Sequence, residues 1–404
     1  MQPRTMPVPI ENAAARRFLL QLAGLSGPPP RASDRVELYQ AVERLGFVQL
    51  DSINAVERAH HHILHSRCRG YRHDHLSRLV EKDRLLCEHW THDAAVLPTA
   101  FFPYWRHRFE REKERLPTRW DGRFGGAAFA RECATVLDRI ARDGPVLARD
   151  FEGDRPRTGW WDWHPSKTAL EFLWHTGELA ITRREGFQKV YDLSERVIPA
   201  EHFARRVSRE EFVDWACRSA LERLGFATRG EMAAFWGLFT PDVAGEWLRR
   251  NASDLETLHV ATAAEGKPLV VHALAGTHRM IAEALPASPR IRVLNPFDPL
   301  LHDRRRAERV FGFHFRIEVF VPEAKRKYGY YVFPVLRGAN VIGRLDMRAD
   351  RKDGALAVRA FWPEPGLRRT AALQRGLEAE IDRVRRFAGL ATVRYAQDWM
   401  RDPA

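Results

Sequence analysis

The amino-acid sequence predicts an α+β protein in which tandem winged-helix (helix-turn-helix) domains are followed by a small C-terminal β-barrel. Two observations lead to this prediction. Three predicted helices followed by a strand hairpin occur twice in the middle of the chain, and this is the order of elements in a winged helix. After Arg290 the pattern changes to strongly alternating strands and a final helix, which is typical of a small barrel or a strongly bent sheet.

The N-terminal part, residues 1–125, is predicted to form a helical or winged-helix domain with a less regular pattern than the two repeats. Apolar spacing favours helices over residues 12–22, 34–45 and 56–67. A short, mostly apolar strand around residues 49–51 separates the last two of these helices. This strand carries the most informative polar residues of the chain.

The first complete winged-helix pattern lies within residues 126–200. Apolar side chains at helical spacing predict a helix over 133–143, and Gly144-Pro145 ends it. The pattern continues with a short helix over 146–151, a tryptophan-rich loop, a helix over 166–175 capped by Ser166, and strands over 179–184 and 187–193 around Glu185-Gly186.

The same order returns within residues 201–285, which we assign to a further winged helix. It comprises helices over 210–224, 229–238 and 241–250, and strands over 257–264 and 267–272 around Glu265-Gly266. In the preceding unit, the basic residues Arg183, Arg184 and Lys189 would lie on the wing.

The C-terminal domain, residues 286–404, is predicted to be a β-barrel closed by a helix. The strands are expected over 313–322, 328–337, 340–348 and 355–362, and the helix over 367–387. Lys325, Arg326 and Lys327 then stand at a hairpin tip, with Tyr330 close behind. Basic and aromatic groups on one loop suit phosphate contact with stacking or wedging in a groove, and the alternative is a solvated surface charge run.

Composition favours a polyanionic partner. The chain of 404 residues has a formal net charge of +12, and basic groups near phosphates release condensed counterions. It carries no apolar stretch of membrane-spanning length and no signal-peptide pattern, so we expect a soluble, cytoplasmic monomer. The scattered cysteines Cys68, Cys87, Cys133 and Cys217 form no Cys-x-x-Cys pair, which favours reduced thiols over a zinc knuckle or an iron-sulfur cluster.

Gln49 and Asp51 are the candidate catalytic pair. In an extended backbone, side chains two residues apart leave the same face, so a proton-accepting carboxylate and a water-orienting amide would point together. An ionised Asp in an apolar strand is costly unless it is paired or used. The alternative is an Asp at the strand end that caps the next helix.

The histidines after this strand raise the question of a metal. His61 and His65 have the i, i+4 spacing of a zinc helix, but the Glu that a metallohydrolase uses as base does not follow His61. We therefore expect no metal and no cofactor. Packing and hydrogen bonding beneath the Gln49–Asp51 strand is the favoured role for His60, His61 or His65, and one of them could reach DNA.

Gln49-x-Asp51, followed by Glu57-Arg58-Ala59-His60-His61, resembles the bacterial AlkZ/YcaQ winged-helix DNA glycosylases, and specifically their Gln-x-Asp (AlkX) branch. The resemblance continues in family order through blocks at 88–98, 191–199, 295–306 and 328–331. It departs at His89 and near His302, where the family favours aromatic residues.

The resemblance implies a monofunctional glycosylase that acts on double-stranded DNA containing alkylated purines or interstrand crosslinks. Asp51 would be the base and electrostatic stabiliser, and Gln49 would hold the water or contact the lesion. Because a crosslinked base cannot flip freely, the DNA would lie across an open cleft of a C-shaped molecule. The candidate DNA contacts are Arg58, His60, Arg183, Arg184, Lys189, Arg304, Arg305, Arg306, Lys325, Arg326, Lys327 and Tyr330.

Two other functional classes remain open at this point. A transcription regulator would also contain winged helices, but it leaves the Gln49–Asp51 strand and the large C-terminal domain unexplained. A nuclease would need a carboxylate cluster for Mg²⁺, and the sequence shows no such grouping near the proposed site.

Overall fold

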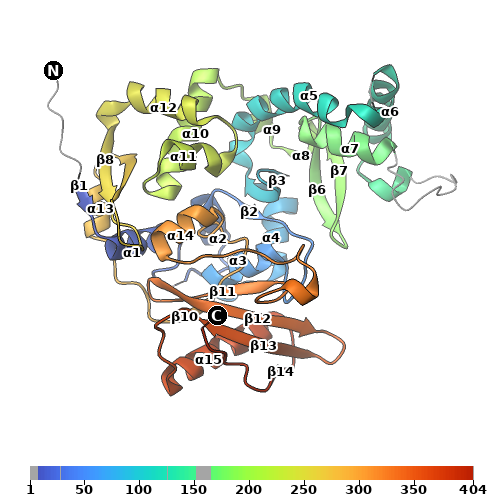
Figure 1. Ribbon diagram of the computed structural model, residues 1–404. Coiled ribbons are helices and arrows are strands. Elements are labelled where there is room, and N and C mark those ends of the chain that lie inside the picture. The colour runs from blue at the N-terminus through green and yellow to red at the C-terminus, as the bar shows by residue number, and fades with distance from the viewer. Residues whose placement is uncertain (1–7, 28, 125, 152–164, 404) are drawn as a thin grey trace. The chain divides into compact units, whose positions relative to one another are not determined.

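The computed structural model describes residues 8–27, 29–124, 126–151 and 165–403, and it shows a mixed α+β fold (Figure 1). The chain divides into two compact units, here called unit 1 (Met1–His73 with Cys217–Ala404) and unit 2 (Asp74–Ala216). The predicted tryptophan-rich loop falls on residues 152–164, outside the described residues. Among the described residues, no helix is long and apolar enough to cross a membrane.

Unit 1 begins with the elements that lead to the candidate catalytic pair. They are β1 (Val8–Ile10), α1 (Asn12–Leu22), α2 (Arg35–Leu45), β2 (Val48–Gln49) and α3 (Ala59–Arg67). Asp34 caps α2 by accepting hydrogen bonds from the backbone N–H groups of Val36 and Glu37. The predicted helices over 12–22 and 34–45 are confirmed, whereas α3 begins three residues later than expected.

Gly46 turns the chain from α2 into β2. Its φ of +84° lies in the region that favours glycine, and a Cβ there would lie 2.8 Å from the Trp236 ring and 2.9 Å from Arg223. The turn therefore needs glycine both for its backbone conformation and for the space beside the Trp236 ring. This close approach fixes where β2 starts.

Unit 2 opens with elements that the sequence patterns did not predict. These are α4 (His73–Ser77, which starts at the unit boundary), the π-helical turn Arg78–Lys82, the hairpin of β3 (Leu86–Trp90) and β4 (Ala94–Pro98), the 3-10 turn Thr99–Phe101, and α5 (Phe102–Phe124). The two strands pair antiparallel from Leu86 opposite Pro98 to Trp90 opposite Ala94. Their side chains are almost all buried, so the alternation that marks a half-buried strand is missing.

The rest of unit 2 follows the predicted order with corrections. It contains α6 (Ala127–Asp143), β5 (Val146–Leu147), the 3-10 turn Ala148–Phe151, α7 (Pro165–His175), β6 (Leu179–Glu185), β7 (Gln188–Leu193), α8 (Ser194–Val197) and α9 (Ala200–Ala204). The expected short helix over 146–151 is partly wrong, because Val146 and Leu147 pair with β7. Ser166 lies inside α7, where its hydroxyl donates to Glu132 at 2.5 Å. The β6–β7 hairpin is confirmed.

The second repeat of the pattern is confirmed in its element types. The chain forms α10 (Arg209–Leu224), α11 (Arg229–Trp236), α12 (Pro241–Arg250), the 3-10 turn Ala252–Asp254, β8 (Leu255–Val260), β9 (Leu269–Leu274) and α13 (Thr277–Ala282). The connection between the two strands is longer than the predicted two-residue turn, since Val260 pairs with Leu269. β1 adds to this hairpin in parallel with β8.

The C-terminal part of unit 1 is a curled five-stranded sheet with the order β10-β11-β12-β13-β14. Its strands are β10 (Ile291–Val293), β11 (Val332–Arg337), β12 (Asn340–Asp350), β13 (Ala355–Pro363) and β14 (Thr392–Tyr395), and α15 (Ala371–Phe387) covers one face (Figure 1). Leu377 and Ile381 of α15 pack with Phe333 and Phe361 in one buried cluster. No pairing joins β10 to β14 among the described strands, so the predicted small β-barrel is corrected to an open half-barrel.

The predicted strand over 313–322 is wrong. Phe313 and Phe315 are buried and alternate with exposed neighbours, but the segment forms no ladder among the described residues and ends in a turn at Val319–Phe320. The alternation arises because the two rings enter the core of unit 1, where Arg344 lies over Phe313 and donates to the His314 carbonyl. Lys325–Lys327 therefore lie in an irregular loop between α14 (Arg304–Phe311) and β11, with a 3-10 turn over Glu323–Lys325.

Candidate active site

β2 ends at Gln49, so the predicted strand around 49–51 is shorter than expected, and Asp51 lies two residues beyond it in a turn. Its Oδ1 accepts a 2.6 Å hydrogen bond from the backbone N–H of Ile53, and the residue is half-buried. Gln49, the last residue of β2, is 6% exposed. The alternative that Asp51 caps the next helix does not apply, because Arg58 stands at the N-cap of α3. The carboxylate instead fixes the turn that presents it.

Tyr331 and Asn295 form a buried polar pair near Asp51. Tyr331 is 2% exposed and Asn295 is fully buried, and the phenol and the amide lie 3.3–3.4 Å apart. The Asn295 Oδ1 also accepts from the backbone N–H of Phe297 at 2.9 Å. Burial raises the pKa of Tyr331; the Asn295 hydrogen bond opposes this shift, and the negative charge of Asp51 adds to it. The Tyr331 phenol therefore stays neutral at neutral pH, and Asp51 acts on it electrostatically.

Arg304 brings a positive charge to the same neighbourhood. It donates to the carbonyls of Pro296 at 2.5 Å and Leu301 at 2.9 Å, and its guanidinium lies over the Phe315 ring. Burial lowers the pKa of Arg304 to about 10, while Asp298 and other anionic groups oppose the shift. Arg304 stays charged at neutral pH, and its charge also acts on Tyr331.

A buried ion pair anchors this group to α3. Arg67 and Asp298 form two hydrogen bonds of 2.7 Å, with side chains that are 3% and 0% exposed. Arg67 also donates to the carbonyls of Ala23 and Ile63, and the Asp298 Oδ1 accepts from the Leu300 backbone. The turn that carries Asn295 and Arg304 is thus tied to the helix that follows Asp51.

The histidines of α3 pack against other rings and backbone groups and do not form a cluster of metal ligands. The fully buried His62 ring contacts the Val293 carbonyl at 3.1 Å, His61 contacts the Tyr71 hydroxyl at 2.8 Å and stacks on His73, and His65 stacks on Phe387. Burial lowers the pKa of both His61 and His65 to about 3, so both are neutral at neutral pH. Within the described residues, no group of three or more His, Cys, Asp or Glu could hold a metal ion.

Two predicted DNA contacts lie at the start of α3. Arg58 is half-buried at the N-cap, and His60 is 5% exposed with its ring 4.0 Å from that of His61. Beside them, Glu57 accepts from Arg351 at 2.9 Å and pairs with His73 at 3.2 Å. Burial opposes ionisation of Glu57, but these two partners hold its pKa below the usual value. His60 therefore offers little surface to a ligand.

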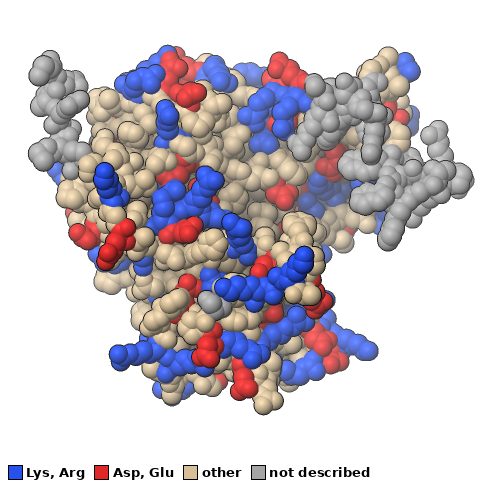
Figure 2. Space-filling model, in the orientation of Figure 1, with Lys and Arg blue, Asp and Glu red and all other residues tan. Residues whose placement is uncertain are grey.

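The other basic residues predicted in unit 1 divide by exposure. Arg306 is 6% exposed, donates to the Leu224 carbonyl and lies 3.4 Å from the buried Glu231, so it holds unit 1 together. Arg305, Lys325, Lys327 and Tyr330 are exposed, and Arg326 is half-buried with its guanidinium over the Tyr330 ring. Figure 2 shows Lys and Arg side chains interleaved with Asp and Glu over the sheet and the loop before it.

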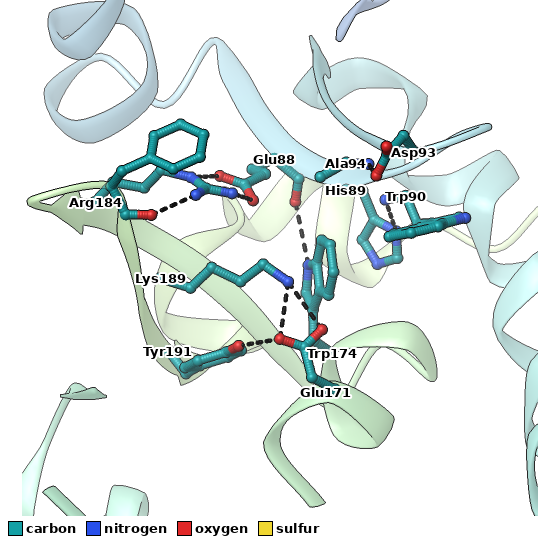
Figure 3. A network of polar contacts seen from close by, with 11 residues as sticks. Glu88, His89, Trp90, Asp93, Ala94, Glu171, Trp174, Arg184, Lys189 and Tyr191 are labelled. Carbon is teal, nitrogen blue, oxygen red and sulfur yellow. Dashed lines mark hydrogen bonds and ion pairs between the residues drawn. The ribbon is translucent and has the colours of Figure 1, made fainter. Parts of the chain in front are cut away.

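The predicted wing cations of unit 2 have carboxylate partners inside that unit (Figure 3). Arg184 donates twice to Glu88, at 2.7 and 2.5 Å, and Lys189 contacts both oxygens of Glu171 while it lies over the Trp174 ring. Arg183 pairs with Glu185 at 2.7 Å and is 42% exposed. Of these three cations, Arg183 keeps the most surface.

His89 and His302, the two departures from the family pattern, are both in aromatic contacts. His89 is 3% exposed, packs on Phe109 and Trp174, and accepts from the Trp90 backbone N–H at 2.8 Å. Burial lowers the pKa of His89 well below its usual value, so the ring stays neutral. His302 meets the Phe47 ring edge-on at 5.9 Å. Both imidazole rings thus pack against aromatic side chains at positions where the family favours aromatic residues.

Sequence reasoning assigned no site role to Asn295, Asp298, Tyr331 or Arg67. The blocks at 295–306 and 328–331 contain the first three, but nothing in their spacing joins them to residue 51. Arg67 belongs to a segment interpreted only as a helix. The available signal was the mostly apolar segment around Asn295 and Asp298, because polar groups that are buried alone are costly.

Comparison with known proteins gives a consistent result. The family model described as "DNA glycosylase AlkZ-like" matches residues 42–387. The solved structure of the Streptomyces sahachiroi DNA glycosylase AlkZ is similar, with a TM-score of 0.65 and 17% sequence identity, over 97% of this chain and 100% of that chain. At this identity the structural likeness shows a shared fold, and the family model covers most of the chain.

Proposed function

The chain belongs to the AlkZ-like DNA glycosylase family, and from this membership we propose that it hydrolyses the N-glycosidic bond of alkylated purines, above all N7-alkylguanine, and unhooks interstrand crosslinks. The chain is thus a DNA glycosylase, and the lesion is the proposed part. The observation that carries the proposal is the half-buried Asp51 carboxylate, fixed by the Ile53 N–H and electrostatically coupled to Tyr331.

In the proposed mechanism, Asp51 acts on both the water and the sugar. Its carboxylate stabilises the positive charge that develops at C1′ as the C1′–N9 bond breaks, and it accepts a proton as water oxygen bonds to C1′. Gln49 orients that water or contacts the lesion nucleotide. The buried Tyr331 phenol and the Arg304 guanidinium set the charge around the carboxylate.

The proposed substrate explains why one carboxylate is sufficient. A purine alkylated at N7 or N3 is already cationic, so the bonding electron pair leaves with a base that becomes neutral, and no general acid is needed. Residues 46–67 contain no lysine, so an imine-forming lyase step is not expected. The product should be an abasic site.

We further propose that the helix-helix-helix-hairpin segments are winged helices that hold DNA. In unit 2 this segment comprises α6, the turn after β5, α7 and the β6–β7 hairpin, and the other comprises α10, α11, α12 and the β8–β9 hairpin. Among the predicted contacts, exposure favours Arg183, Arg305, Lys325 and Lys327 as phosphate ligands. The protein is proposed to act as a monomer in the cytoplasm.

An excision assay tests this function. The full chain is incubated, in parallel reactions containing Mg²⁺ or EDTA, with one duplex bearing a single N7-alkylguanine and another bearing a defined interstrand crosslink. We expect release of the free base, strand breaks only after alkali, and separation of the crosslinked strands on a denaturing gel. Strand breaks without alkali would indicate a nuclease, and binding without base release would indicate a regulator.

The three loop cations, two of them exposed and Arg326 half-buried, give a first binding prediction. Replacing Lys325, Arg326 and Lys327 together by Ala should weaken binding to damaged and undamaged duplexes alike, because phosphate contacts carry no lesion information. The slope of log affinity against log salt should flatten by up to about three units if each cation neutralises one phosphate. Fluorescence anisotropy over a salt series measures both quantities.

A matched variant controls for the loss of three charges. Arg368, Arg369 and Arg375 are also exposed, near the start of α15, and their joint replacement by Ala changes the net charge equally. We expect that variant to keep the wild-type slope. Equal slopes for the loop variant and the wild type would place the loop away from DNA and direct attention to Arg183 and Arg305.

A further inference from the structure

Phe320 is the most exposed large apolar side chain among the described residues, at 94% of its full surface. A single exposed apolar residue is ordinary on a protein surface and by itself indicates nothing. Phe320 is unusual because the backbone that presents it is fixed and because cations flank it. We call residues 318–331 the Phe320 loop.

Hydrogen bonds close the Phe320 loop on itself. The Glu318 carboxylate accepts from the backbone N–H groups of Lys327, Tyr328 and Gly329 at 2.9–3.0 Å. Burial opposes ionisation of Glu318, but the three hydrogen bonds hold its pKa below the usual value. The base of the loop is therefore pinned at neutral pH.

The turn at Phe320 is fixed from both sides. The Val321 N–H donates to the Glu318 carbonyl at 3.0 Å, and Arg326 Nε donates to the Val321 carbonyl at 2.8 Å. Gly329 has a φ of +129°, and a Cβ there would lie 2.7 Å from an Asp346 oxygen, so the loop lies close against β12. The loop is already ordered in the free protein, so binding loses little further conformational entropy, and this preorganisation favours binding.

Positive charge flanks the exposed ring along the chain. Lys325 and Lys327 are exposed on the C-terminal side, and Arg326 lies over Tyr330. On the N-terminal side, a hollow of about 530 Å³ is lined by the arginines Arg304, Arg305 and Arg316 together with Glu308, His314, Phe315 and Ile317. An apolar ring with cations before and after it in the chain suits a base step, whose two strands each carry phosphates.

The Phe320 loop also leads into the candidate active site. Its last residue is Tyr331, whose phenol is coupled to Asp51 and hydrogen-bonded to Asn295. Tyr330, directly before it, also acts electrostatically on Tyr331. The loop therefore carries the exposed ring at Phe320 and, eleven residues later in the same stretch of backbone, the Tyr331 phenol on which Asp51 acts electrostatically.

We propose that Phe320 inserts between base pairs of duplex DNA beside the target nucleotide, while the cations on both sides hold the phosphates. This inference rests on the proposed DNA glycosylase function and adds the device that opens the stack. A wedge exposes a glycosidic bond without extruding the base, which suits a nucleotide tied to the opposite strand. Stacking of a base on an aromatic side chain also supplies affinity without sequence preference.

The test measures base unstacking directly. A duplex carries an N7-alkylguanine and, in the neighbouring base pair, 2-aminopurine, whose fluorescence rises when it loses its stacking partners. Binding is followed in the Asp51→Asn background, so that no base is released. We expect a fluorescence rise with Phe320 present and its loss with Phe320→Ala, together with about ten- to a hundredfold weaker binding.

Two matched variants sharpen the test. Phe320→Leu keeps an apolar wedge and should retain most of the signal. Leu285→Ala removes another exposed apolar side chain, 62% exposed, and should change nothing. The salt slope should stay at its wild-type value in Phe320→Ala, because no phosphate contact is lost. This separates the wedge from the cations beside it.

Either of two outcomes would overturn the wedge. In the first, the wild-type chain and Phe320→Ala give the same fluorescence rise and the same DNA affinity. In the second, Phe320→Ala changes only the oligomeric state measured by sizing chromatography, so the ring would be a contact between copies of the chain. Failure of the proposed function is distinct, since it would show as no base release by the wild-type chain with Phe320 in place.

Discussion

Asp51→Asn is expected to slow base excision by about three orders of magnitude or more while leaving the fold and DNA affinity close to wild type. The amide cannot accept the proton of the attacking water or stabilise positive charge at C1′. Its Oδ1 can still accept the hydrogen bond from the Ile53 N–H that holds the turn, so the variant should fold normally. Single-turnover release of N7-alkylguanine measures the effect.

Asp34→Asn is the matched control for this change. Asp34 also uses its carboxylate to hold backbone N–H groups, at the N-cap of α2, where Asn serves equally well. Asp34→Asn should excise at the wild-type rate.

Gln49→Ala should lose less excision activity than Asp51→Asn, on the order of ten- to a thousandfold, if the amide only orients the water. Near-normal excision by Asp51→Asn would remove Asp51 from the mechanism.

Asp298→Asn is expected to have the largest effect on stability, because it leaves Arg67 charged and buried without its counterion. Breaking a buried pair by neutralising one partner costs about 3–5 kcal/mol. The two side chains are 3% and 0% exposed, so solvent cannot compensate. Urea-induced unfolding followed by circular dichroism should show the loss as a lower midpoint at an unchanged slope.

A second substitution at Arg67 and a substitution in an exposed ion pair test the cause of this loss of stability. Adding Arg67→Met to Asp298→Asn removes the uncompensated charge and should recover part of the stability. Asp402→Asn removes the anion of an exposed pair with Arg369, in which the Asp402 side chain is 94% exposed, and should cost under about 1 kcal/mol. A change of that size for Asp298→Asn would show that Arg67 is satisfied by its carbonyl partners alone.

Secondary structure was predicted best from the sequence where local residues alone specify the element. The helices α1, α2, α10 and α12 and the β6–β7 hairpin follow from local spacing, caps and turn residues. Local patterns failed where burial removed the alternation, as in β3 and β4. They also failed at 313–322, where alternating burial comes from rings that enter the core without any ladder of hydrogen bonds.

For the candidate site, the sequence by itself determined the motif of Gln49 and Asp51, the basic character of the chain and the family to which it belongs. Only the tertiary structure decided what surrounds the carboxylate. Asn295, Arg304 and Tyr331 lie hundreds of residues away, and the Arg67–Asp298 pair brings their segment to α3. Tertiary contacts likewise leave Lys325 exposed while Arg184 and Lys189 meet Glu88 and Glu171. A charge in the sequence has no partner until the chain folds, because Coulomb energy and desolvation depend on distance and burial, which sequence spacing does not specify.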